Sequence, residues 1–157
     1  MLISFDADAT LVEINTNYPQ FDILTCRDNG SGMTKDEFER LMDGGIGNSK
    51  KRADGEPEKT PIGRPVIGRI GIGMLAIAQV CYEFKVVSHH RASRTAFEAM
   101  VNLKLYRRDE IAAGEIAPEG EYEIGMYECK EVPYESERDG VLIVTKDLRN
   151  PRVTPKV

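Results

Sequence analysis

Three glycines lead directly into an apolar segment in the middle of the chain, in the stretch Gly68-Arg69-Ile70-Gly71-Ile72-Gly73. Glycine adopts positive φ angles and lets another molecule approach the backbone without a Cβ in the way. The residues from Met74 onward are good helix formers, so we expect a helix N-terminus after the turn. Unpaired N–H groups and the positive end of the helix dipole favour anions there. The stretch is therefore a candidate phosphate-binding turn, although the motif alone is a weak signal.

A second glycine turn, Asp28-Asn29-Gly30-Ser31-Gly32, begins with an aspartate at the end of a strand-like segment. A carboxylate held at a strand end can accept a hydrogen bond from an exocyclic amine, such as the one at N6 of adenine. The glycines that follow would let a flat base lie against the backbone. Between the two turns, residues 45–67 are polar, aperiodic and rich in glycine and proline. A loop of that length in a compact domain indicates a lid that closes over a ligand.

The paired motifs Asp28-x-Gly30-x-Gly32 and Gly68-x-x-Gly71-x-Gly73 resemble those of the GHKL family. This family contains the ATPase domains of gyrase, the heat-shock chaperone, histidine kinases and mismatch-repair proteins, and the style of the motifs is similar to that of stand-alone chaperone-like or MORC-like members. The resemblance extends from Asp6 to Leu148. It implies an α+β Bergerat fold, a two-layer α/β sandwich in which helices cover one face of a mixed, mainly antiparallel sheet. It also implies a single ATP-binding domain over residues 1–157, with residues 45–67 as the ATP lid.

The resemblance implies a role for each matching residue. Asp28 would bind the adenine amine, directly and through a water, while Gly30 and Gly32 shape the adenine pocket and Met33 packs beside the base. The lid hinge and the phosphate-binding turn would be formed by a second set of residues: Gly68, Gly71, Gly73 and Met74.

Ser49 and Lys50 resemble the Ser-x-Lys motif that opens the lid in some branches of the family. Two interpretations of Lys50 remain open at this point. It lies near the phosphates, or it is a solvated lysine in the basic run that ends at Arg52.

The first motif of the family, Glu-x-x-x-Asn-x-x-Asp-Ala, is only partly matched. There the glutamate activates water and the asparagine holds Mg²⁺. Counting back from Asp6, the asparagine position falls on Ile3, which cannot ligate a hard cation, and the glutamate position falls before Met1. We expect the chain to be truncated at its N-terminus, with loss of hydrolysis as the alternative. We assign no catalytic and no metal-binding residue.

A second departure concerns the last strand, where the family often has Gly-Thr to bind the adenine-linked water. Here Gly140 is followed by Val141, and Thr145 lies too far along the strand to replace that hydroxyl. Ser31 and Thr25 are the hydroxyls that could compensate.

Composition sets the remaining limits. The chain has 157 residues, 41% of them hydrophobic and 30% charged, with a formal net charge of -5, which fits one soluble domain and gives no charge signal for nucleic-acid binding. The three cysteines suggest free thiols rather than a disulfide framework. The sequence contains no apolar run of membrane-spanning length, so we expect a cytoplasmic protein with no membrane contact.

The pattern of the chain predicts a hairpin of strands at Leu11–Asn15 and Phe21–Cys26, then a helix capped by Thr34 and Glu37. Further strands are expected at residues 82–88, 95–105, 122–132 and 140–145, with a turn at residues 89–94 in which residues 91–94 are solvated.

The function that this evidence favours is ATP binding, with ATP hydrolysis in an intact homologue. A non-catalytic nucleotide-binding regulatory module and, with less support, a histidine-kinase catalytic domain are the alternatives. The family also implies ADP as a ligand, and dimerisation and a C-terminal effector region outside this chain.

Overall fold

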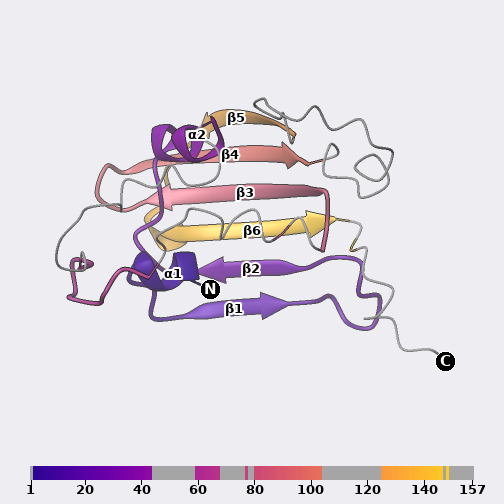
Figure 1. Ribbon diagram of the computed structural model, residues 1–157, viewed down its shortest axis with the longest axis horizontal. Coiled ribbons are helices and arrows are strands. Elements are labelled where there is room, and N and C mark those ends of the chain that lie inside the picture. The colour runs from indigo at the N-terminus through magenta and orange to yellow at the C-terminus, as the bar shows by residue number, and fades with distance from the viewer. Residues whose placement is uncertain are drawn as a thin grey trace, which may run out of the picture.

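One antiparallel sheet dominates the computed structural model, which describes residues 2–43, 59–67, 77, 80–103, 125–146 and 148 (Figure 1). Its six described strands follow the order β1-β2-β6-β3-β4-β5, so β6, the last of them in the sequence, lies between β2 and β3. The described elements are α1 (Leu2–Asp6), β1 (Val12–Asn15), β2 (Thr25–Asp28), α2 (Lys35–Asp43), β3 (Glu83–His90), β4 (Thr95–Asn102), β5 (Met126–Val132), the 3-10 helix η3 (Ser136–Arg138) and β6 (Gly140–Lys146).

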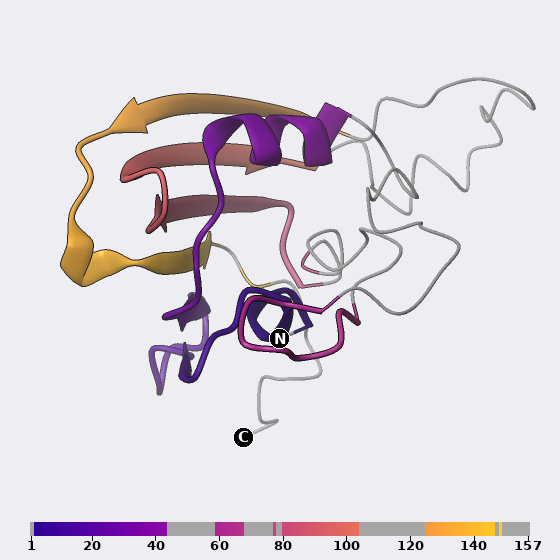
Figure 2. The ribbon, with the colours of Figure 1, turned by 90° about the vertical axis from the view of Figure 1, so that its left-hand side faces the viewer.

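The core lies between α2 and one face of this sheet (Figure 2). Alternate residues of β3 and β4 point to this face, among them Phe84, Val86 and Phe97, all at most 1% exposed. Phe38 of α2 is fully buried against them, with its ring 5.1 Å from that of Phe97. Burial of one such aromatic side chain contributes about 1.5–3 kcal/mol. The helix-on-sheet arrangement confirms the expected α+β sandwich.

The N-terminus of α2 is stabilised by the expected capping box. The Glu37 N–H donates to Thr34 Oγ1 over 3.2 Å, and the Thr34 N–H donates to Glu37 Oε2 over 2.9 Å. These bonds fix the direction in which the chain leaves the Asp28 turn and enters the helix that covers the core.

Several strand boundaries differ from the sequence-based expectation, among them the start of the second strand and the end of β3. The second strand begins at Thr25 rather than Phe21, because the Thr145 hydroxyl binds both the N–H and the carbonyl of Leu24 and Phe21 has a positive φ of 56°. His89 and His90, expected in a turn, belong to β3, and only residues 91–94 form the turn.

Residues 59–67, the part of the expected lid that the structure describes, lie against α1 and the residues that follow it (Figure 2). The Ile62 and Ile67 N–H groups donate to the carboxylates of Asp8 and Asp6 over 3.2 and 2.8 Å. Arg64 donates to the Ala9 carbonyl over 2.8 Å. The C-terminal end of the expected lid is thus attached to the N-terminal helix. None of the helices in the described ranges has the length and apolar content needed to cross a membrane.

Tyr127 connects β5 to the end of α2 by a hydrogen bond from its hydroxyl to Asp43 Oδ1 over 2.8 Å. Burial, together with that bond, raises the pKa of Tyr127 to about 12. The folded protein holds the Tyr127 proton more tightly than the unfolded chain does. The stabilisation linked to this proton is therefore fully present below about pH 10 and is lost as the pH rises through about 12. We expect Tyr127→Phe to lower the free energy of unfolding by about 1 kcal/mol near neutral pH and to reduce its fall at alkaline pH.

Urea denaturation of the wild type and of Tyr127→Phe, at about pH 8 and about pH 11, measures this difference. Tyr18→Phe is the matched control, because Tyr18 is 79% exposed. An identical alkaline loss of stability in wild type and Tyr127→Phe would contradict the assignment.

Candidate functional site

Asp28 is the last residue of β2 and is only 6% exposed. Its neighbour two residues earlier, Cys26, pairs with Ile143, which packs against the core. Because side chains alternate along a strand, Asp28 lies on the same, helix-covered side of the sheet. A buried carboxyl group in that position requires hydrogen-bond partners.

Three neutral donors from different parts of the chain surround the Asp28 carboxylate. Ser4 Oγ of α1 donates to Oδ2 over 2.8 Å. The N–H groups of Gly30 and Val141 donate to Oδ1 over 3.0 and 3.2 Å. A carboxylate offers about four acceptor positions. The three donors found among the described residues therefore leave it able to accept one more hydrogen bond, on the Oδ2 side.

The glycines around Asp28 allow three chain segments to meet there. A Cβ on Gly30 would lie 2.7 Å from the Ala7 carbonyl oxygen, so the end of α1 could not approach the turn. A Cβ on Gly140 would overlap the carbonyl oxygen of Asp28, and one on Gly32 would overlap that of His89. Gly32 has a φ of +73°, which L-residues rarely adopt. Gly30 and Gly32 therefore allow the end of α1 and the end of β3 to pack closely against the Asp28 turn.

Met33 is attached to β3 through both its N–H and its carbonyl group. Its N–H donates to Ser88 Oγ over 2.8 Å, and the Ser88 hydroxyl donates to its carbonyl over 2.9 Å. The side chain packs against the core cluster. The remaining residues of the expected site, Ser49, Lys50, Gly68, Gly71, Gly73 and Met74, lie outside the described residues.

The hydroxyl that contacts Asp28 is that of Ser4, which sequence reasoning missed. Thr145 is fully buried, and its hydroxyl binds Leu24 at the end of the strand pair away from Asp28. Thr25 points to the opposite side of the sheet from Asp28, and Ser31 Oγ donates to the Gly32 carbonyl over 3.3 Å. The one signal for Ser4 was a small polar residue in an otherwise apolar N-terminal segment.

Within the described ranges, the side chains do not form a cluster that fits Mg²⁺. The described part of the chain contains no group of three or more His, Cys, Asp or Glu side chains that could hold a metal ion. Ile3, at the position where the resemblance to the family predicts an asparagine ligand, carries no oxygen on its side chain. Asp6 Oδ1 and Asp8 Oδ2 accept backbone N–H groups from residues 59–67, whereas Asp8 Oδ1 is buried without a hydrogen-bond partner among the described residues.

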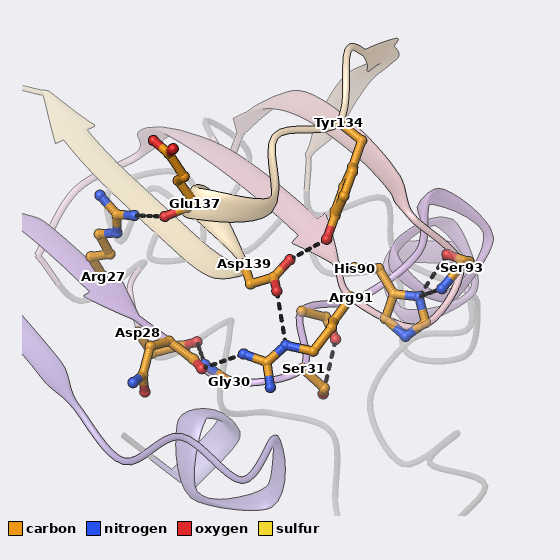
Figure 3. A network of polar contacts seen from close by, with 12 residues as sticks. Arg27, Asp28, Gly30, Ser31, His90, Arg91, Ser93, Tyr134, Glu137 and Asp139 are labelled. Atoms are coloured by element: carbon orange, nitrogen blue, oxygen red, sulfur yellow. Dashed lines mark hydrogen bonds and ion pairs between the residues drawn. The ribbon is translucent and has the colours of Figure 1, made fainter.

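The expectation that residues 91–94 form a merely solvated turn is wrong for Arg91, which pairs with Asp139. Its side chain is 62% exposed, but Nε donates to Asp139 Oδ2 over 2.8 Å (Figure 3). His89 is 3% exposed, and its Nδ1 accepts the Glu135 N–H over 3.1 Å, so it is an internal acceptor rather than a turn residue. The segment between β5 and β6 therefore folds back over the turn between β3 and β4.

The family model described as "Histidine kinase-, DNA gyrase B-, and HSP90-like ATPase" matches residues 3–132. The chain belongs to this family. Among solved structures, the GHKL domain is similar to the ATPase and transducer domains of DNA topoisomerase II from Balamuthia mandrillaris. The two share 15% identity with a TM-score of 0.58, over 93% of this chain and 35% of that one. This similarity supports the shared fold.

The Aquifex aeolicus MutL ATPase domain complexed with ADP is also similar, with 18% identity and a TM-score of 0.44, over 98% of this chain and 42% of that one. The GHKL domain thus spans less than half the length of either solved chain. No curated protein matches the sequence.

Proposed function

We propose that this GHKL domain binds ATP and ADP, with the adenine amine donating to the carboxylate of Asp28. The observation that carries the proposal is the buried Asp28 side chain, which three neutral donors hold in place and which retains acceptor capacity. Membership of the family supports a nucleotide as the ligand. The proposal extends to Met33 beside the base, to Ser49 and Lys50, and to Gly68, Gly71, Gly73 and Met74 around the phosphates.

The geometry favours adenine over guanine. Adenine presents an amino group at position 6, whereas guanine presents a carbonyl oxygen there. A carboxylate accepts hydrogen bonds only, so the guanine oxygen would face it without a proton between them. In a buried site that mismatch is not compensated by water, and it is costly.

Isothermal titration with ATP, ADP and GTP tests the proposal. We expect ATP and ADP to bind and GTP to bind at least about tenfold more weakly. Equal affinity for GTP and ATP would contradict the assignment of Asp28 to the base.

Because Ile3 has no side-chain oxygen to bind Mg²⁺, the proposal for this chain is nucleotide binding without Mg²⁺-dependent hydrolysis, which is the non-catalytic alternative. We therefore expect ADP affinity to be unchanged by EDTA and phosphate release from ATP to stay at the uncatalysed rate. Phosphate release that requires Mg²⁺ would show that other residues supply the metal site.

A further inference from the structure

The turn between β3 and β4 touches the Asp28 turn directly. The Arg91 N–H donates to the Ser31 carbonyl over 3.0 Å, and its Nη2 atom lies 3.5 Å from the Asn29 carbonyl oxygen. Gly32 packs against the backbone of His89. Arg91 thus contacts the loop that places the Gly30 N–H on Asp28.

The same guanidinium also contacts the segment that leads into β6. Arg91 Nε donates to Asp139 Oδ2, and Tyr134 donates to the other carboxylate oxygen over 2.7 Å (Figure 3). Burial would raise the pKa of Asp139, but the hydrogen bonds from Arg91 and Tyr134 hold it below its usual range. Asp139 directly precedes Gly140 and Val141, and the Val141 N–H is the second backbone donor to Asp28.

Arg91 therefore bridges the two backbone segments that converge on the Asp28 carboxylate. One is the turn after β2, and the other is the start of β6. The two segments are far apart in sequence, and the guanidinium spans them because its planar fork carries several donors in fixed directions. Lysine has a compact ammonium group, which could pair with Asp139 but would not contact the Asn29 carbonyl at the same time.

We propose that Arg91 is a positioning residue for nucleotide binding: it holds the ends of β2 and β6 in the register that keeps Asp28 oriented toward the base. The proposal rests on the proposed function. The proposal predicts a loss of nucleotide affinity without a large loss of stability. The Arg91 side chain is 62% exposed, so its ion pair with Asp139 contributes little to folding. A misplaced acceptor carboxylate, in contrast, weakens binding directly.

The test compares Arg91→Ala and Arg91→Lys with Arg138→Ala. Arg138 is the matched control, because it is 60% exposed and pairs with Glu135 in the segment that also carries Asp139. We expect Arg91→Ala to weaken ADP binding by roughly 5- to 20-fold in isothermal titration, Arg91→Lys to recover part of the loss, and Arg138→Ala to bind like the wild type. The urea midpoints of all three variants should stay close to that of the wild type.

A second measurement needs no nucleotide. In ¹H–¹⁵N spectra of the free protein, we expect the Gly30 and Val141 amide signals to shift in Arg91→Ala and to keep their positions in Arg138→Ala. If the wild type binds ADP and Arg91→Ala binds it equally well, the positioning role is wrong and the proposed function stands. If the wild type does not bind ADP, the proposed function is wrong. Unmoved Gly30 and Val141 signals overturn the role of Arg91 in either case.

Discussion

Asp28→Asn is expected to abolish most of the affinity for adenine nucleotides while the fold is retained. Asparagine has the shape of aspartate, and its carbonyl oxygen can accept the N–H groups of Gly30 and Val141 that now bind Oδ1. Its amide group would face Ser4 Oγ, which can turn its lone pairs toward a donor. Every present contact of the side chain can therefore be satisfied in the variant.

The adenine amine would lose its acceptor in that variant, because two N–H donors would face each other. A hydrogen bond to a charged group contributes about 1.5–3 kcal/mol, so ATP and ADP should bind roughly 10- to 150-fold more weakly. Isothermal titration measures the loss, and circular dichroism verifies that the fold is intact.

Asp22→Asn is the matched control for Asp28→Asn. Asp22 precedes the same strand but is exposed, and its carboxylate accepts from Asn17 Nδ2, a bond that asparagine can retain. Nucleotide affinity should be unchanged in it. Unaltered nucleotide binding by Asp28→Asn would mean that the base does not contact this carboxylate.

Gly32→Ala is expected to have the largest effect on stability among the variants considered. The residue has a φ of +73°, where an L-side chain costs about 1–2 kcal/mol, and its new Cβ would overlap the His89 carbonyl oxygen. That oxygen belongs to the backbone of β3, inside the ladder with β4 and β6, so it cannot move without disturbing the sheet. We expect a total loss of about 3–4 kcal/mol, a large part of the stability of a domain of this size.

Gly63→Ala separates the two causes of that loss. Gly63 also has a positive φ, +86°, but an added Cβ would meet no atom within 4 Å. Gly63→Ala should therefore lose only about 1–2 kcal/mol of stability, which is the cost of the left-handed conformation for an L-residue. Urea denaturation of both variants gives the comparison, and equal losses would show that contact with β3 is not the cause.

The elements with strong local signals were predictable from the sequence. Thr34 and Glu37 define the start of α2, and the strands expected at residues 82–88, 95–105 and 140–145 coincide largely with β3, β4 and β6. These features depend on residues close together in the chain, so a short window contains the information. The prediction of a turn beginning at His89 is wrong, because His89 and His90 belong to β3 and the segment that contacts His89 lies between β5 and β6, more than 40 residues away in the sequence.

For the candidate site, the sequence by itself indicated the kind of ligand, through an aspartate followed by glycines and through the family to which the chain belongs. Which groups surround Asp28 was decided only by the tertiary structure. Ser4 and Val141 donate to Asp28 from α1 and β6, and Arg91 contacts the loop after Asp28 from the β3–β4 turn; the local sequence of these residues does not show that they meet there. They meet because β6 inserts between β2 and β3, an order set by packing of the whole sheet rather than by any one segment.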